Sequence, residues 1–300
     1  PSPPLPLSPS RPLALALSHS LVILPSYIYF YRQLQYTGMT NHRIETFPAS
    51  RIATIDIGGI GKRKHHVTGL IELDVTAVRK QIRDYNRNHP EKVSFNAWLI
   101  SVIARTVKNH DAAGAFLKGR RKLVIFDDVN VSVAVEKEID GRKVPIPLVI
   151  EKAHEIPISD ITRLIAEARS KEITGRDIVL QKRSSRMENL YYHLPRFMRL
   201  AFWKYFLGRP KMSFKKMGNV AFTSIGTAGN VRGWFIPFSI HPACFGISAI
   251  QNKPIAVGGK VEVREILPMT ILLDHDVMDG APMARFINEL TGSIESGSGI

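Results

Sequence analysis

The sequence predicts an α/β domain built on one mixed β-sheet, and three observations support this. From Arg51 onward, short runs rich in β-branched residues alternate with segments whose apolar residues recur at helical spacing. No repeat of about 20–50 residues is visible, which argues against a solenoid or propeller. The composition, 44% hydrophobic and 22% charged, is that of an ordinary globular protein. Strands and helices in this mixed order favour a single sheet with helices packed on it.

The first half of the domain begins with a strand that ends at residues 70–75, after which apolar residues recur at helical spacing over 75–85. Ser94 is a suitable N-cap for a second helix, 95–107, which is apolar on most faces and therefore predicted to be buried. Further strands are expected over 122–126, 129–135 and 144–150. A helix capped by Ser159 follows them.

The last third of the chain again favours strands, and a final helix follows Gly280 with its apolar residues on one face. The expected strands are 219–224, 243–250, 260–266 and 269–274. The single cysteine, Cys244, lies in one of these apolar runs. We interpret it as a small buried residue rather than a nucleophile, and it has no partner for a disulfide within the chain.

The first 38 residues differ in composition from the rest and are rich in Pro, Ser and Leu. The apolar stretch 13–30 contains Pro25 and several polar residues, so it is a poor transmembrane helix. A signal peptide has weak support because Arg11 is the only basic residue ahead of that stretch and no clear cleavage site follows it. We expect residues 1–38 to be a disordered or non-native extension and residues 39–300 to form the domain.

Residues 173–217 are unusually basic and aromatic, and we treat them as a helical insertion. One helical stripe runs through Leu190, Leu194, Phe197, Ala201 and Tyr205. Such a stripe can belong to a basic amphipathic helix that touches a membrane surface. The alternative, which the pattern favours, is a helix that packs its aromatic face on the domain and leaves its charges in solvent.

Lys and Arg exceed Asp and Glu by 41 to 26, a formal net charge of +15. This excess favours an anionic partner, which can be nucleic acid, an acidic membrane surface or a phosphorylated ligand. No pattern typical of an RRM, a zinc finger or a helix-turn-helix is present, so nucleic acid is not expected. The sequence has no CxxC pair and no HExxH run, and it predicts no metal site.

The junction between the last strand and the last helix contains the strongest chemical signal. The apolar run 269–273 leads directly to Asp274 and His275, and Asp279 and Gly280 follow. An imidazole at a strand end is held by rigid backbone and titrates near neutral pH, so His275 is a candidate general base. Gly280 is expected to adopt a backbone conformation that other residues resist. Taken alone, HxxxD is a weak pattern, and a lone histidine there is more often structural.

The run 274–280 resembles the DHxxxDG signature of dihydrolipoyl acyltransferases, and the HHxxxDG signature of chloramphenicol acetyltransferase. The resemblance covers about residues 51–294. It includes the basic segment 62–67, the strand-to-helix step 70–76, the paired strands 122–135 and 144–150, and the segment Phe222-Thr223-Ser224-Ile225-Gly226, which is similar to the serine-containing FTISNLG strand. It implies a two-layer sandwich like that of chloramphenicol acetyltransferase, assembled as a homotrimer with active sites between neighbouring subunits.

The resemblance also implies roles for individual residues. His275 would deprotonate an acceptor thiol or hydroxyl, which then attacks the thioester of acyl-CoA. Thr223 of the next chain would stabilise the oxyanion, with Ser224 as the alternative donor. Asp279 would pair with Arg63 and hold the His275 loop; the equal alternative is that Arg63 is one member of a basic run. His66 matches a family histidine and receives no chemical role. The excess positive charge suits the phosphates of coenzyme A.

The sequence departs from the family because residues 1–50 contain no lipoyl-lysine hairpin signature, so no lipoyl group is expected on this chain. The acceptor is then a lipoyl domain supplied in trans or a small molecule with a hydroxyl or amine. Two alternatives remain open: a non-catalytic trimeric scaffold of the same fold, and a basic protein that binds membrane surfaces or nucleic acid. A cytoplasmic location is expected. The acyl group and any larger cage are left open.

Overall fold

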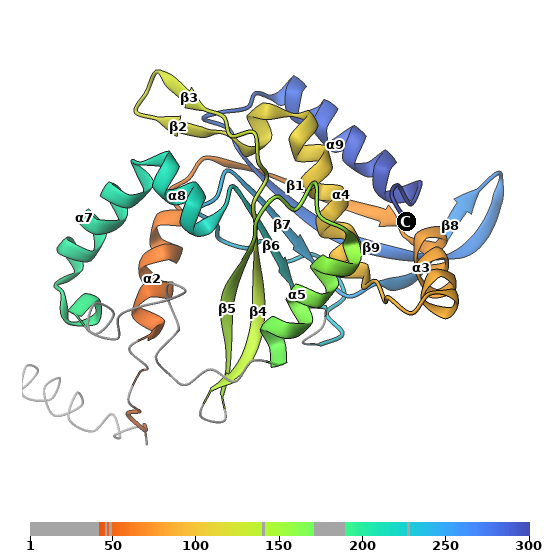
Figure 1. Ribbon diagram of the computed structural model, residues 1–300, viewed down its shortest axis with the longest axis horizontal. Helices are drawn as coiled ribbons and strands as arrows, with labels where there is room; N and C mark the ends of the chain where they lie inside the picture. The colour runs from red at the N-terminus through yellow and green to blue at the C-terminus, as the bar shows by residue number, and fades with distance from the viewer. Residues whose placement is uncertain (1–41, 46, 48–49, 140–141, 171–189, 227–228) are drawn as a thin grey trace, which may run out of the picture. The chain divides into compact units, whose positions relative to one another are not determined.

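In the computed structural model, seven strands form one mixed sheet in the order β1-β9-β7-β6-β4-β5, and β8 pairs with β9 (Figure 1). Pairs β4–β6 and β6–β7 are parallel and the other pairs are antiparallel. The strands are β1 (His66–Asp74), β4 (Val131–Ile139), β5 (Arg142–Ile150), β6 (Val220–Ser224), β7 (Ala243–Ile247), β8 (Gln251–Val257) and β9 (Lys260–Asp274). The predicted mixed sheet is confirmed.

The structure describes residues 42–300 except 46, 48–49, 140–141, 171–189 and 227–228. The predicted extension over 1–38 and the first part of the insertion, 173–189, therefore lie outside the described residues. Residues 48–300 form one compact unit, and every element named below belongs to it. Within the described part of the chain, no helix has both the length and the apolar character of a membrane span.

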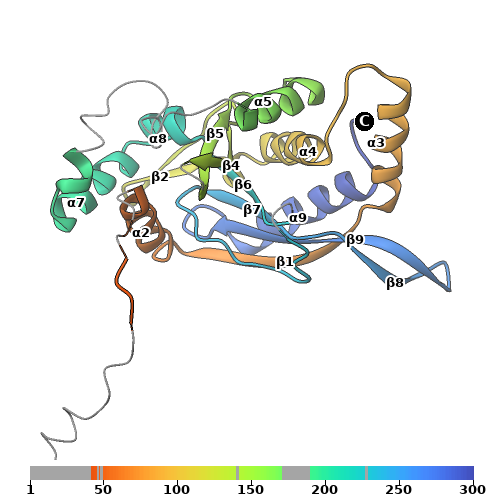
Figure 2. The ribbon, with the colours of Figure 1, turned by 90° about the horizontal axis from the view of Figure 1, so that it is seen from below.

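Four helices pack on the same face of the sheet and enclose the main core (Figure 2). They are α3 (Thr76–Asn88), α4 (Phe95–Asn109), α5 (Ile158–Ser170) and α9 (Gly280–Glu295). Helix α4 is buried along most of its length, as its sequence predicts, and Trp98 is fully buried. The expected cap is also confirmed, because the Ser94 hydroxyl accepts a hydrogen bond from the backbone N–H of Ala97 at 3.2 Å.

The segment 229–242 lies against the opposite face of the sheet. The indole N–H of Trp234 donates to the carbonyl of Ile71 in β1 at 2.9 Å, and the Thr270 hydroxyl in β9 donates to the carbonyl of Phe235 at 2.8 Å. Gly246 in β7 allows this close approach, since a Cβ there would lie 3.1 Å from the Phe235 ring. Strand β9 is consequently buried from Leu267 to Asp274.

Three expected boundaries were wrong. The two strands expected over 260–266 and 269–274 are one strand, β9, because Pro268 lies where the neighbouring strand changes from β7 to β8 and so interrupts neither ladder. The run at 122–126 gives β3 (Lys122–Val124), which pairs with β2 (Phe116–Lys118) in a separate hairpin. Helix α5 begins at Ile158, so Ser159 lies in its first turn and does not cap it.

A second, smaller core joins α2 (Ser50–Gly61) to α7 (Arg196–Leu207) and α8 (Pro210–Met217), which lie beside α2 in Figure 1. Its buried members are Trp203, Phe206 and Ile240. The predicted stripe is on the other side of the helix, because Phe197 and Tyr205 are 72% and 54% exposed. The expectation that this stripe packs on the domain was therefore wrong. Two aromatic residues outside the stripe, Trp203 and Phe206, make the packing contacts instead.

Candidate active site

His275 is the first residue after β9, at the end of the sheet where β1 begins. Its backbone N–H donates to the carbonyl of His65 at 2.9 Å, which continues the β1–β9 pairing by one further bond. The sheet therefore fixes the backbone of His275, while the side chain is exposed. An imidazole in this position can exchange protons with a ligand without a change in the strand.

The basic run before β1 lies against the motif because β1 and β9 are antiparallel. The Lys64 ammonium is 2.5 Å from the carboxylate of Asp274, which is only 7% exposed. His65 Nδ1 is 2.9 Å from the carboxylate of Asp276, and this hydrogen bond and charge raise the pKa of His65 above its usual value. Two residues that sequence reasoning left unassigned, Lys64 and His65, thus hold the two carboxylates that flank His275.

Arg63 and Asp279 are not brought together within one chain. Arg63 Nε donates to the carbonyl of Gly59 at 3.2 Å, and no ion pair joins Arg63 to Asp279 among the described residues. Asp279 is exposed and precedes α9, where its carbonyl accepts from the N–H of Met283. Gly280 begins α9 without a positive φ and with open space around it, so the expectation of a restricted backbone conformation was wrong. The Arg63–Asp279 pair remains a prediction for assembled chains.

A chain of histidines connects the motif end of the sheet to α8. His66 Nε2 donates to the carbonyl of His241 at 3.0 Å, and His241 Nε2 donates to the carbonyl of Met217 at 3.0 Å. Burial lowers the pKa of His241 to about 4 and also lowers that of His66, so both rings are neutral near pH 7. Sequence reasoning could not find this link, because 175 residues separate His66 from His241.

The candidate hydroxyl donors lie at the end of β6. Thr223 and Ser224 are its last two residues, and both side chains are half-buried. Ser248 follows β7 at the same end and is 4% exposed, and its hydroxyl has no hydrogen-bond partner in the described part of the structure. Sequence reasoning missed Ser248, which has no motif of its own. Three hydroxyls therefore gather at one end of the sheet.

The hydroxyls and the imidazole of one chain lie at opposite ends of the same sheet. Thr223 pairs with Gly246 in β7, and Gly246 pairs with Thr270 in β9. His275 is five residues beyond Thr270 along the chain, which corresponds to about 17 Å along a strand. Because β9 is buried and paired on both sides, it cannot bend to close this gap. A site that uses both groups needs two chains.

Cys244 takes no part in this arrangement. It lies in β7 and is 2% exposed, and burial raises the pKa of its thiol to about 12. A thiol in this state is protonated at neutral pH and closed to ligands, so it is a poor nucleophile. The interpretation of Cys244 as a small buried residue is confirmed.

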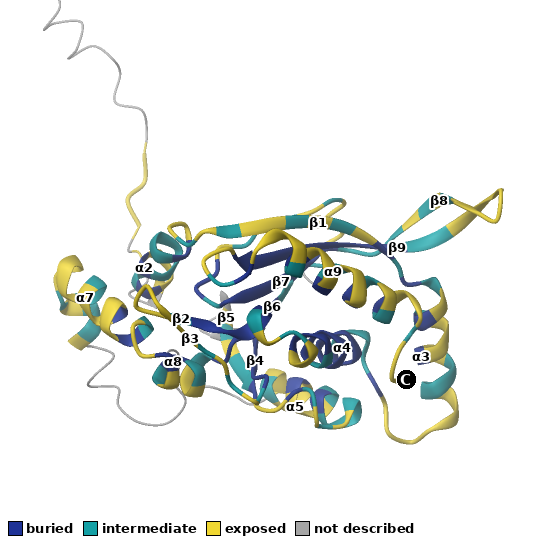
Figure 3. Cartoon of the chain, turned by 90° about the horizontal axis from the view of Figure 1, so that it is seen from above, coloured by how far each residue is buried: buried dark blue, intermediate teal, exposed yellow. Residues whose placement is uncertain are grey.

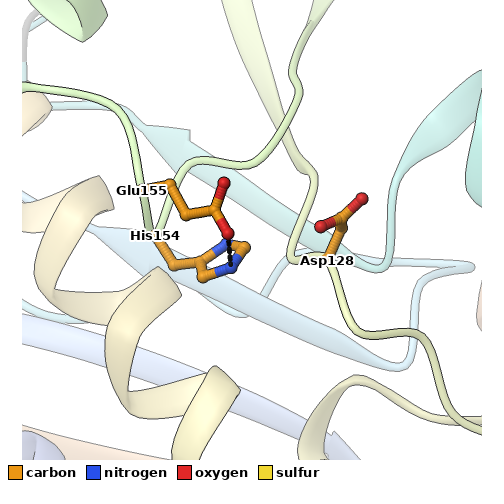
Figure 4. Close-up of side chains that lie close together, drawn as sticks. All are labelled: Asp128, His154 and Glu155. Carbon is orange, nitrogen blue, oxygen red and sulfur yellow. Dashed lines mark ion pairs between the residues drawn. The ribbon is translucent and has the colours of Figure 1, made fainter.

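One group of side chains has the composition of a metal site. Asp128, His154 and Glu155 place their ligand atoms within 4.8 Å of one another (Figure 4). However, His154 Nδ1 accepts from the N–H of Val129, so a neutral ring carries its proton on Nε2 and has no lone pair there for a metal. The ammonium of Lys152 lies 3.6 Å from Asp128 and 3.8 Å from Glu155. We interpret the group as an ion-pair cluster.

The fold places a candidate general base at one end of a mixed sheet and candidate hydroxyl donors at the other. A family model described as the catalytic domain of 2-oxoacid dehydrogenases acyltransferase matches residues 62–179 and 211–299, which is more than half of the chain. The chain belongs to this family. Residues 180–210, which include α7, lie between the two matched regions, and α2 precedes the first.

Individual relatives agree with this assignment. The dihydrolipoyllysine-residue acetyltransferase component of the pyruvate dehydrogenase complex of Mycoplasma pneumoniae is 27% identical over 208 residues, covering 68% of this chain and 42% of that protein. The lipoamide acyltransferase component of the branched-chain complex of Bacillus subtilis is 23% identical over 273 residues, covering 84% and 54%. The chain thus spans about half the length of the curated relatives that it matches.

Solved structures show the same fold. A probable dihydrolipoamide acetyltransferase from Listeria monocytogenes superposes with a TM-score of 0.62 at 16% identity, covering 86% of this chain and 97% of that one. The dihydrolipoamide acetyltransferase of Azotobacter vinelandii has a TM-score of 0.61 at 17% identity, covering 85% and 92%. That enzyme was studied for the role of a serine, a histidine and an asparagine in its catalytic mechanism. The serine precedes the histidine by 52 residues, and the asparagine follows it by 4.

Proposed function

We propose that this protein transfers an acyl group between coenzyme A and a dihydrolipoyl thiol, with His275 as the general base. The observation that carries the proposal is the exposed imidazole of His275, held on the sheet in the DHxxxDG run of a chain from the acyltransferase family. A lipoyl domain is the preferred acceptor, and a small molecule with a hydroxyl or amine is the alternative. Relatives named dihydrolipoyllysine-residue acetyltransferases and succinyltransferases support the preference.

The chemistry needs one base and one oxyanion donor. The imidazole of His275 takes the proton of the acceptor thiol, and the thiolate attacks the carbonyl carbon of the acyl-CoA thioester. The tetrahedral intermediate carries a negative oxygen, which the hydroxyl of Thr223 or Ser224 stabilises by a hydrogen bond. Collapse of the intermediate breaks the bond to the CoA sulfur, and the protonated imidazole returns its proton to that sulfur. His275 is then neutral again for the next turnover.

The spacing in the Azotobacter enzyme supports these roles. Thr223 precedes His275 by 52 residues and Asp279 follows it by 4, the same intervals as those of the serine and asparagine in that enzyme. A threonine hydroxyl can donate the same hydrogen bond as a serine. Asp279 replaces the amide with a carboxylate, which favours a cationic partner, and Arg63 of the assembled protein is our candidate. Ser224 remains the alternative donor.

A trimer of identical chains would complete the site. The distance of about 17 Å between Thr223 and His275 along the sheet argues that each site combines the two ends of neighbouring chains. On the face of the sheet that segment 229–242 covers, an apolar surface is exposed: it includes Leu70 in β1 and Trp234, Ile236 and Phe238 in that segment. An exposed apolar surface of this kind typically marks a protein interface. A second copy that covers it would bring an imidazole to the hydroxyls.

The test is a screen of acyl-CoA thioesters against dihydrolipoamide and against hydroxyl- and amine-bearing acceptors, followed by release of free CoA. We expect turnover with dihydrolipoamide and a loss of about 2–5 kcal/mol of transition-state stabilisation in His275→Ala. His65→Ala is the matched control. It removes another exposed imidazole, from the residue whose backbone carbonyl accepts the hydrogen bond of His275, and should retain most activity. If His275→Ala and the parent protein behave alike with every acceptor, the chain is a scaffold and the proposal is wrong.

A further inference from the structure

The outward face of α7 is apolar although the helix is firmly held. Phe197, Met198, Phe202 and Tyr205 are 72%, 44%, 43% and 54% exposed, and Ala201 between them is exposed as well. These positions lie within one side of the helix at 3.6 residues per turn. Figure 3 shows this helix largely in the colour of exposed residues. Single exposed apolar residues are ordinary, but a continuous aromatic face on one helix usually has an occupant.

The inner face of the same helix explains why the outer face cannot turn inward. Arg199 Nε lies 2.7 Å from the carboxylate of Asp56 in α2, which is almost fully buried. The Tyr191 hydroxyl donates to the same carboxylate at 2.8 Å, and the Trp203 indole N–H donates to the Tyr191 oxygen at 2.9 Å. Each of these buried polar groups has a partner, so rotating α7 would leave the Asp56 carboxylate buried without a partner.

The surroundings of the apolar face are strongly basic. Residues 190–217 contain seven Lys and Arg residues and no Asp or Glu. Six of the seven are exposed: Arg196, Lys204, Arg209, Lys211, Lys215 and Lys216. The Arg209 guanidinium lies 3.8 Å from the centre of the Tyr205 ring. Aromatic side chains between exposed Lys and Arg side chains are the arrangement of helices that lie in the interface of an anionic bilayer.

Two other occupants fit these observations less well. A second copy docking through the same face would place two basic 190–217 segments against each other, and like charges across an interface are unfavourable. Double-stranded nucleic acid would neutralise the basic residues, but its bases are stacked inside the duplex and its phosphate backbone offers nothing to the exposed Phe197 and Phe202 side chains. An anionic lipid surface satisfies both, because headgroups pair with the cations and the acyl boundary accepts the rings.

The face also lies outside the part of the chain that carries the shared chemistry. The family model leaves out α7, which carries this surface, and α2, which packs against its inner face. We propose that α7 docks the protein onto anionic lipid surfaces, with Phe197 and Phe202 in the interface and the flanking basic residues at the headgroups. This inference goes beyond acyl transfer and does not depend on it.

Co-sedimentation of the whole chain with vesicles tests the proposal. We expect binding to phosphatidylserine–phosphatidylcholine vesicles, weak binding to pure phosphatidylcholine, and loss of binding as salt is raised. Phe197→Ser with Phe202→Ser should weaken binding about tenfold or more by removing the inserted rings. Lys204→Glu with Lys211→Glu should weaken it by a similar factor. The matched control is Val261→Ser with Val263→Ser, which alters two exposed apolar residues on β9 and should leave binding unchanged.

Further measurements separate this surface from the active site. His275→Ala should bind vesicles like the parent protein, and the phenylalanine variant should release CoA from soluble substrates at the parental rate with an unchanged melting temperature. The proposal is overturned if the parent does not sediment with anionic vesicles or if the phenylalanine variant binds as well as the parent. It is also overturned if that variant changes the oligomeric state, which would assign the face to contacts between chains, or if DNA binds while vesicles do not.

Discussion

Mixed trimers offer the sharpest test of a site shared between chains. The two perturbations are His275→Ala in one population and Thr223→Ala with Ser224→Ala in the other. Each parent trimer lacks one of the two groups at every site. Removing the base is expected to lower the rate by a factor of about 10²–10⁴, and removing the oxyanion donor by about 10²–10³. Each population alone should therefore show about 1% of the activity or less.

The geometry fixes the recovery on mixing. In a closed three-fold ring, each site takes its imidazole from one chain and its hydroxyl from the next. After purification on both tags, every ring contains two chains of one variant and one of the other, so one of its three sites receives both groups and about a third of the sites are restored. If both groups came from one chain, which the 17 Å estimate from the strand register argues against, no site would be restored.

The assay is co-expression of the two populations with different affinity tags, purification on both tags, and measurement of CoA release with dihydrolipoamide. A parallel preparation mixed after purification, without subunit exchange, serves as the control and should show no recovery. Activity of the doubly purified trimers that does not exceed the sum of the two parents would refute the composite site. It would leave the role of His275 to be judged from the single variant alone.

Three further predictions follow from single residues. Lys64→Met should lower the free energy of unfolding by about 2–3 kcal/mol in urea titrations, because it leaves Asp274 buried without its cation. Adding Asp274→Asn should recover part of the loss. Equal stability of Lys64→Met and the parent protein would contradict the pairing. Burial lowers the pKa of His241 from 6.5 to about 4. Between these two pH values His241 is therefore protonated in the unfolded chain and neutral in the folded chain. Stability should then fall by about 1.4 kcal/mol per pH unit between pH 6.5 and about pH 4. His241→Gln should flatten this slope in unfolding curves at pH 7 and pH 5, and an equally steep slope in the variant would assign it to other groups. Gly280→Ala should change the free energy of unfolding by no more than about 0.5 kcal/mol, and a loss above 2 kcal/mol would show that this position does need a glycine.

The sequence predicted the parts of the fold that depend on local patterns. The buried helix after Ser94 and the strand that ends at Asp274 both follow from apolar periodicity and a capping side chain, which act over a few residues. Strand β9 was split in two because Pro268 normally ends a strand. Only the order of neighbouring strands, which is a long-range property, shows that the missing N–H of Pro268 lies where the partner of β9 changes from β7 to β8.

The candidate site shows the same division between local and long-range information. His275 could be chosen from its motif, because strand, histidine and helix follow one another in the chain. Its surroundings could not, because the register of β1 against β9 decides which basic residue reaches the motif. That register brings Lys64 to Asp274 and leaves Arg63 exposed beside Gly59. The link from His66 through His241 to α8 joins three distant parts of the chain and has no local signal.

The buried Asp56–Arg199 pair has a consequence for how this chain can be shortened. The aspartate and the arginine lie in two stretches that the family model leaves out, and each would be costly without the other, by about 3–5 kcal/mol for a buried ion stripped of its counter-ion. Any attempt to shorten this protein to the residues that the family model matches should therefore remove or keep both helices together.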